Sequence, residues 1–533
     1  MCELLIPIET KNADTAEDRL LRQTTLPRPN RSSIFRLVFL LALAALALHF
    51  IASSHYGFFR DELYYIACGN HLAFGYVDQP PLIAVIARLS SFLFGTTLSG
   101  FRFFPALAGA FLVLLTGWMT RELGGGHFAQ ALASLAVLLA PIYLAFGSFL
   151  SMNAFEPVLW MACAYILVRI LKGGDERFWL LFGAVAGVGV QNKHTMLLFG
   201  FAIVAGMILT RDWKRLNSKW LWLGGLLAFV IFLPNLIWEA HHNWPQLEVV
   251  RNCQRLKNTP VGVLRFFGEL ILFLNPVALP VIAAGLAWLF LSKREKRFRA
   301  VGWASLVVII MVIILHGKTY YPVPFYSILL AAGSVAFEML FENRKRLRLI
   351  CVAMLAVSGS VMLPFALPIL PLQALARYQN VLSLQNVVKM EDDSSGEFHQ
   401  LYADMLGWES MVATIAKVYH HLPSSDQKQC VILAGNYGEA GAIDLLGAEY
   451  GLPKAISGHN NYYFWGTNGH TGEVVILFGQ HAESTKTMFS SVEQAATISN
   501  GHGVAAEKHL PVYVCRHPKA PLERLWPSLR YYE

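Results

Sequence analysis

The chain has 533 residues, of which 55% are hydrophobic and only 15% are charged, and its formal net charge is +8. A soluble domain carries about 25% charged residues, so this composition excludes a water-soluble globule of this size. The Lys and Arg residues stand in short clusters between long apolar runs. This distribution favours anchoring at the cytoplasmic face of a membrane over nucleic-acid binding as the reason for the positive charge.

The first apolar run begins near Phe35, after a polar N-terminal stretch. The run has no small-residue cleavage site, and it ends at the aromatic and charged sequence HYGFFRDELYY. We therefore expect a retained first membrane span rather than a cleaved signal peptide. Residues 1–34 are expected to form a disordered cytoplasmic tail.

Apolar runs of about 18–25 residues recur along the chain, and each is long enough to cross a hydrocarbon core of roughly 30 Å. They predict a polytopic α-helical membrane domain over residues 35–372 with about eleven transmembrane helices. The fifth and sixth runs are short and are joined by QNKHT, which is consistent with a shallow hairpin. The predicted spans are about 36–54, 98–120, 128–147, 154–171, 178–192, 194–210, 219–239, 265–291, 300–316, 321–341 and 348–370.

Three strongly basic loops, 211–219, 293–299 and 343–348, fall on one side of the membrane if the N-terminus lies on that side. The positive-inside rule makes that side cytoplasmic. Eleven spans then place residues 373–533 on the opposite side, which is the periplasm for a bacterial inner (cell) membrane.

Residues 373–533 differ in composition from the rest of the chain, because they lack long apolar runs. Short apolar runs between turn residues predict buried strands in QCVILAGNY, GEVVILFGQ and PVYVCR, with a helix over EAGAIDLLGAEYG. We therefore expect a small soluble α/β domain. Cys430 and Cys515 both fall in it, and a disulfide between them stays open if the compartment is oxidising. The seven cysteines are scattered without a CxxC pair, so no metal cluster is expected.

The first loop on the non-cytoplasmic side, 55–97, carries adjacent carboxylates at Asp61 and Glu62. Charges just past a span are usually only solvated, but here apolar and aromatic residues flank them on both sides. A partly desolvated carboxylate is suited to act as a general base. The loop then turns back through Asp78 and two prolines into IAVIARLSSFLFG, which we interpret as a helix lying along the membrane interface.

Glu156, at the start of the fourth span, is a second candidate catalytic acid, although it also suits a helix N-terminus. Lys193 and His194 lie between the two short spans. Intramembrane basic residues are functional candidates by default, and an ordinary charged loop is the competing interpretation. Carboxylate oxygens at Asp61, Glu62 and Glu156 would also suit a divalent cation, so a metal requirement stays open.

Further cations interrupt the positive-inside bias and indicate an anionic ligand on the non-cytoplasmic side. Lys318 stands beside the phenols of Tyr320 and Tyr321, a combination that suits a phosphate as well as an aromatic belt. Carboxylates and cations thus meet at one lipid boundary, where cations can hold a lipid phosphate and a carboxylate can deprotonate an acceptor. The candidate phosphate-binding residues are Lys193, His194, Arg251, Arg255, Lys257, Lys318, Tyr320 and Tyr321.

Several motifs occur in the order found in one known family. They are RDELYY, DQPPL, MNAFEPVLW, QNKHT, KTYYPVPFYSILLAAG, GNYGEAGAIDLLG and SGHNNYYFWG. With these motifs the chain resembles the bacterial members of glycosyltransferase family 39, the protein O-mannosyltransferase-like group of the GT-C superfamily.

The resemblance implies a helical bundle with interfacial helices in the first loop. It also implies inverting transfer of a sugar from an undecaprenyl- or dolichyl-phosphate carrier to a lipid, glycan or protein acceptor. The family's catalytic aspartate corresponds to Asp61. Many relatives have an aspartate where Asn153 stands, and some have a lysine or histidine in place of Gln79. A transporter or flippase of lipid-linked sugars is the alternative interpretation, and the long first loop and added domain favour the enzyme.

Overall fold

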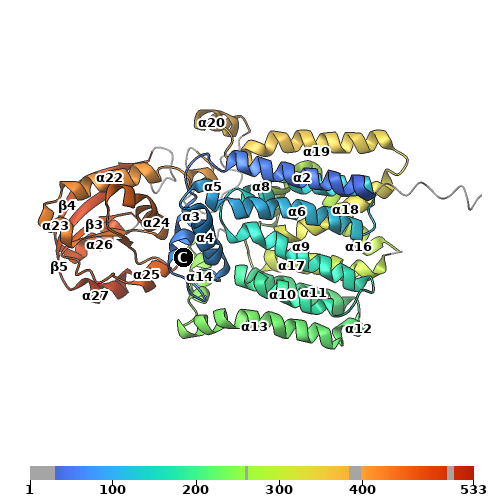
Figure 1. Ribbon diagram of the computed structural model, residues 1–533, viewed down its shortest axis with the longest axis horizontal. Coiled ribbons are helices and arrows are strands. Elements are labelled where there is room, and N and C mark those ends of the chain that lie inside the picture. The colour runs from blue at the N-terminus through green and yellow to red at the C-terminus, as the bar shows by residue number, and fades with distance from the viewer. Residues whose placement is uncertain (1–30, 258–261, 294, 383–397, 480, 501–508) are drawn as a thin grey trace, which may run out of the picture.

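The computed structural model describes residues 31–257, 262–293, 295–382, 398–479, 481–500 and 509–533. Figure 1 shows a bundle of long helices joined at one end to a domain that contains a β-sheet. We call this the domain end of the bundle and the opposite one the far end. The start of α2 (Arg31–Ala52) and the short helix α12 (Trp213–Leu216) lie at the far end (Figure 1).

Within the described residues, seven helical segments are long and apolar enough to cross a membrane. Two further pairs are bent: α7 and α8 meet at 61°, and α15 meets the segment Pro276–Leu291 at 102°. Pro141 begins α8, and Asn275 has a left-handed backbone (φ 72°) and accepts a hydrogen bond from the Val277 N–H at 3.1 Å. The seven are Phe35–Ala52 in α2, Leu98–Glu122 in α5 and α6, Met152–Leu171 (α9), Lys219–His241 (α13), Lys296–Ile314 in η3 and α17, Val323–Leu340 (α18) and Lys345–Ala366 (α19).

The eleven predicted apolar runs coincide with these seven segments, with the two bent pairs and with the short helices α10 and α11. The bent pairs are α7 (His127–Leu138) with α8 (Pro141–Gly147), and α15 (Val263–Leu274) with α16 (Leu279–Leu291). The prediction of a polytopic helical membrane protein with a small C-terminal sheet domain is confirmed. One boundary was wrong: α2 begins at Arg31, so 31–34 are helical. The rest of the predicted tail lies outside the described residues.

Helices α10 (Phe178–Asn192) and α11 (Thr195–Leu209) have 15 residues each, which gives a length of about 22 Å. Gly183 packs against the Gly224 backbone, where an added Cβ would lie 2.0 Å from the carbonyl oxygen. The Gln191 amide reaches the Ile231 carbonyl, yet α13 continues to His241, about 15 Å further. The turn between α10 and α11 is therefore recessed from the domain end of α13.

The first loop fills the space at this end with α3 (Arg60–Asn70) and α4 (Leu82–Phe94), which lie between the bundle and the C-terminal domain (Figure 1). Asn235 of α13 donates to the Phe74 carbonyl at 2.9 Å and holds the loop to the bundle. Helix α4 buries its Ile83, Ala84, Ala87 and Ser90 side, while Phe92 is 82% exposed. This apolar exposed side agrees with the predicted helix, and its place at a membrane interface stays a prediction.

The C-terminal domain contains a five-stranded sheet in the order β2-β1-β3-β5-β4. Strands β1, β2 and β3 are parallel, whereas β5 is antiparallel to both β3 and β4. Helix α24 (Tyr437–Leu446) follows β1, as the sequence predicted. The strands are β1 (Cys430–Ala434), β2 (Ala455–Ile456), β3 (Val474–Phe478), β4 (Phe489–Ser499) and β5 (His509–Pro518).

The two cysteines of this domain are free in the structure. Cys430 is paired with Val474, while Cys515 is paired with Val475 on the other edge of β3. Neighbouring strands lie about 4.8 Å apart, and β3 lies between the strands of Cys430 and Cys515. Their Cα atoms are thus two strand spacings apart, which exceeds the roughly 7 Å limit for a disulfide. The disulfide that the sequence left open is therefore not formed.

Candidate functional site

Asp61 lies in the first turn of α3, half-buried between the bundle and the C-terminal domain. A helix N-terminus favours a negative charge, because its first N–H groups are not paired within the helix. The hydroxyl of Tyr437 in α24 donates a hydrogen bond to Asp61 Oδ1 at 2.9 Å. The carboxylate with the strongest sequence signal is thus in contact with the C-terminal domain.

Glu62 has a different environment from its neighbour, because its side chain is fully buried. The Arg102 guanidinium contacts both of its oxygens, from Nε at 3.2 Å and from Nη2 at 2.9 Å. The backbone N–H groups of Phe59 and Leu150 also donate to it, at 2.8 and 2.7 Å. Glu62 therefore fastens α3 to the bundle.

A second group of side chains gathers at the recessed turn between α10 and α11. The Lys193 ammonium donates to Glu156 Oε2 at 2.9 Å and to Asn153 Oδ1 at 2.7 Å. Glu156 is 3% exposed, and its other oxygen accepts from the Thr195 hydroxyl. The structure therefore brings two predicted site residues, Glu156 and Lys193, into one ion pair.

The phenols of the KTYYP motif complete this group. The Lys193 ammonium lies 5.5 Å from the ring centre of Tyr320 and 5.1 Å from that of Tyr321. Lys318 belongs to the same turn, because its backbone carbonyl accepts a hydrogen bond from the Tyr321 N–H at 3.0 Å. Lys193, Glu156, Lys318 and both tyrosines thus share one neighbourhood, which we call the Lys193 cluster.

Tyr65 of α3 links Asp61 with the Lys193 cluster. Burial raises the pKa of Tyr65 well above its ordinary value, and the charges of Asp61 and Asp78 raise it further. Tyr320 contributes to the same shift. Tyr65 therefore lies within electrostatic reach of both groups, and Asp61 and the Lys193 cluster belong to one region at the domain end.

The remaining predicted residues lie elsewhere or are only partly described. His194 hydrogen-bonds the Asn235 amide oxygen at 3.0 Å and so helps hold α11 to α13. Arg251 in α14 (Pro245–Asn252) and Arg255 in η1 (Cys253–Lys257) are exposed, and neither has an ion pair with another described residue. Lys257 ends η1, and its side chain lies outside the described residues.

Comparisons with known proteins show what the chain and its fold resemble. Residues 78–238 match the family described as dolichyl-phosphate-mannose-protein mannosyltransferase. The structure resembles ArnT from Cupriavidus metallidurans bound to undecaprenyl phosphate, with a TM-score of 0.60 and 16% identity over 89% of this chain and 97% of that one. The chain has the GT-C fold.

A second structure with this GT-C architecture comes from an archaeon. It is the oligosaccharyltransferase AglB from Archaeoglobus fulgidus in complex with an inhibitory peptide and a dolichol-phosphate, with a TM-score of 0.51 and 11% identity. The alignment covers 85% of this chain and 70% of that one. The resemblance inferred from the sequence motifs is therefore confirmed.

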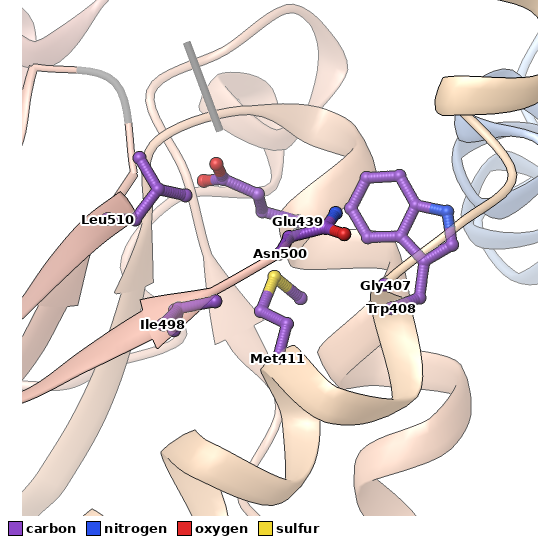
Figure 2. Close-up of a pocket in the computed structure, with 7 residues that line it drawn as sticks. All are labelled: Gly407, Trp408, Met411, Glu439, Ile498, Asn500 and Leu510. Atoms are coloured by element: carbon purple, nitrogen blue, oxygen red, sulfur yellow. The ribbon is translucent and has the colours of Figure 1, made fainter. Parts of the chain in front are cut away.

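The chain also contains a pocket inside its C-terminal domain, and the described residues that line it include none of the predicted site residues. Figure 2 shows it between α22 (Trp408–His421), α24 and the end of β4, and Glu439 is the charged side chain among the described residues that line it. Among the described residues, no group of three or more His, Cys, Asp or Glu side chains is placed to hold a metal ion. The pocket is lined by Gly407, Trp408, Met411, Glu439, Ile498, Asn500 and Leu510.

Sequence reasoning missed two residues that hold the site together. Arg102 stands at the start of a predicted span, and the cost of burying a charge there was the signal that it must be paired. Tyr437 lay inside a motif of the resemblance, but it is 376 residues from Asp61 in sequence. No local pattern reveals a contact over that separation.

Proposed function

We propose that this multi-pass membrane protein is a glycosyltransferase that moves a sugar from a polyprenyl-phosphate donor to an acceptor at the domain end of the bundle. The observation that carries the proposal is the joint presence there of the half-buried Asp61 and the Lys193 cluster. The GT-C fold and the match over residues 78–238 support it. ArnT and AglB, each described with a polyprenyl-type phosphate bound, support the donor class.

The donor phosphate is proposed to approach Lys193. An ammonium group has three N–H donors, and Asn153 and Glu156 account for two of them. The third has no hydrogen-bond acceptor among the described residues, and the side chain is 15% exposed. Lys318 and the hydroxyls of Tyr320 and Tyr321 supply further donors near this position. Positive charge here would stabilise the phosphate as it leaves the sugar.

The proposed chemical step is a single displacement. Asp61 accepts the proton of the attacking acceptor group, whose oxygen or nitrogen forms a bond to the anomeric carbon. The bond between that carbon and the phosphate oxygen breaks, and the electron pair leaves with the polyprenyl phosphate. One attack from the opposite face inverts the configuration of the sugar.

The other predicted residues take supporting parts in the proposal. Glu62 fastens α3 through Arg102, and Glu156 orients and partly neutralises Lys193. His194 fixes the recessed turn through Asn235. Arg251, Arg255 and Lys257 attract the anionic donor from α14 and η1. No divalent cation is required by this scheme, and the question stays open.

The proposed location is a bacterial inner membrane, with the N-terminus in the cytoplasm and residues 373–533 in the periplasm. The basic segment 211–219 supports this orientation, because it includes α12 at the far end (Figure 1). The donor and acceptor would then meet on the periplasmic face. Neither the described residues nor the comparisons support the transporter or flippase alternative.

The test is sugar transfer by the purified protein in nanodiscs. The protein is incubated with a radiolabelled undecaprenyl-phosphate sugar and a membrane extract that supplies acceptors. Label should move from the donor lipid to a second molecule, with release of undecaprenyl phosphate. Label that stays on the donor lipid, with no release of undecaprenyl phosphate, would contradict the proposal.

A further inference from the structure

Tyr437 of the C-terminal domain reaches across to the first loop and hydrogen-bonds Asp61 Oδ1 at 2.9 Å. A phenol has a single O–H to donate, so in this arrangement Tyr437 donates it to the proposed general base. The contact joins two parts of the chain that are 376 residues apart. Contacts of its ring, of its backbone and of α24 hold Tyr437 in this position.

Two other rings pack against the ring of Tyr437. Tyr64 stacks on it at a centroid distance of 4.6 Å and an interplanar angle of 28°, and His459 lies at 4.6 Å and 33°. Tyr64 is itself fixed, because its hydroxyl donates to Asp78 Oδ1 at 2.8 Å. With two rings packed against it, the Tyr437 ring has little freedom to swing its hydroxyl away from Asp61.

The backbone that carries Tyr437 is also fixed. Asn436 caps α24 by accepting from the Glu439 N–H at 3.0 Å, and Glu439 accepts from the Asn436 N–H at 3.2 Å. This reciprocal pair is a capping box. The Tyr437 N–H donates a hydrogen bond to His459 Nδ1 at 3.3 Å. The side chain of Tyr437 therefore points in a fixed direction from the first turn of α24.

Two glycines set the position of α24 against α3. A Cβ on Gly441 would lie 2.9 Å from the Leu63 carbonyl carbon, and a Cβ on Gly438 would lie 2.5 Å from the Arg60 side chain. Larger residues at these positions would push the two helices apart. Close approach of the helix backbones therefore brings the phenol within reach of Asp61.

The surrounding contacts make the loop and the domain one packed unit. Arg60 forms an ion pair with Asp404 at 2.9 Å, and the Trp408 indole donates to the Phe58 carbonyl at 2.9 Å. Leu63 and Ile443 belong to the same buried hydrophobic cluster. The loop that carries Asp61 thus shares its core with the soluble domain.

We infer that Tyr437 is a positioning residue supplied by the C-terminal domain, which orients the Asp61 carboxylate for proton transfer. This inference rests on the proposed function of Asp61. A donor aimed at one carboxylate oxygen fixes the rotation of the group, and it stabilises the charged form. The soluble domain therefore completes the reaction site.

The test compares Tyr437→Phe with the wild-type enzyme, using turnover and the KM for a polyprenyl-phosphate sugar. The substitution keeps the stacked ring and removes only the hydroxyl. Without the hydroxyl the Asp61 carboxylate is no longer held in one orientation, and misplacement of a reacting group can cost about 100-fold in rate, so kcat should fall about 10- to 100-fold. The KM for the donor should stay within about two-fold, which also shows that the variant is folded.

The pH profile separates positioning from a purely structural effect. The Tyr437 hydroxyl stabilises the Asp61 carboxylate, so its removal raises the pKa of Asp61. A general base must be deprotonated to act, and the acid limb of kcat should therefore move to higher pH. Tyr513→Phe is the matched control, because Tyr513 donates to Glu483 elsewhere in the same domain. Its profile should match that of the wild-type enzyme.

Asp61→Asn and the double variant complete the experiment. If Tyr437 acts through Asp61, Asp61→Asn with Tyr437→Phe should be no slower than Asp61→Asn alone. An unchanged kcat and acid limb in Tyr437→Phe, with Asp61→Asn inactive, would overturn the inference and leave the proposed function intact. Full activity of Asp61→Asn would overturn both the role of Asp61 and the positioning role of Tyr437.

Discussion

Glu62 and Arg102 form a buried ion pair in which two guanidinium nitrogens contact the two carboxylate oxygens, with side-chain exposures of 0% and 1%. The pair ties the first turn of α3 to the start of α6 (Phe103–Glu122). Adjacent residues on a helix point about 100° apart. Fixing Glu62 toward the bundle therefore also sets the direction of Asp61.

Replacing Glu62 should destabilise the protein severely. Glu62→Ala leaves the Arg102 charge buried without its partner, which typically costs about 3–5 kcal/mol. Unfolding in detergent should therefore occur at a markedly lower temperature. Glu493→Ala is the matched control, because Glu493 is 72% exposed and its ion pair with Arg516 is long, at 3.9 Å. Such an exposed pair contributes little to stability. Equal stability of the two variants would show that the pair does not hold α3.

Lys193→Ala should weaken donor binding. Loss of one charge-assisted contact to phosphate is expected to raise the Kd for the donor lipid about ten-fold or more. Lys172→Ala is the control, since Lys172 pairs with Glu122 at 2.7 Å and follows the opposite end of α9. Binding of a labelled polyprenyl phosphate in nanodiscs gives the measurement. Unchanged binding in Lys193→Ala would remove the Lys193 cluster from the phosphate site.

The exposed arginines are expected to act at longer range. Arg251→Ala with Arg255→Ala should raise the donor KM at low ionic strength, and the difference from wild type should shrink as salt increases, because exposed charges are screened. Lys318→Ala should lower donor affinity with a weaker salt dependence, since Lys318 is half-buried. A donor KM that is insensitive to all three substitutions would place the anionic ligand elsewhere.

The sidedness of the membrane domain can be checked with reporter fusions. A reporter that is active only in the periplasm should be active when it is fused after Glu533. A cytoplasmic reporter at the same position should be inactive, and it should be active when inserted into the basic segment 211–219. The reverse pattern would contradict the proposed orientation.

Much of the fold could be predicted from the sequence, because span length and charge follow from the physics of the bilayer. The shortness of the fifth and sixth runs already indicated the recessed turn that carries Lys193. Strand β2 escaped prediction because it has two residues, and β4 because most of its side chains are exposed. Neither carries the buried apolar run on which the strand prediction relied.

The site was harder to predict, because its residues meet only in three dimensions. Asp61 stood out through its apolar flanks, whereas Glu62 has the same flanks and is buried in an ion pair. Which of two adjacent carboxylates faces the reaction depends on Arg102, which comes 40 residues later. The contact between Tyr437 and Asp61 depends on how the C-terminal domain packs against the first loop. Such contacts carry no periodic signal in one sequence.

The most direct test of the account is sugar transfer by purified Asp61→Asn in nanodiscs, measured beside Glu62→Gln and Glu156→Gln. The substitution keeps the size of the side chain and a hydrogen-bond acceptor for Tyr437, but it removes the basicity. Positioned proton transfer contributes about 10²–10⁴-fold in rate, so turnover should fall by that factor while donor binding persists. Turnover near the wild-type level in Asp61→Asn would contradict the account.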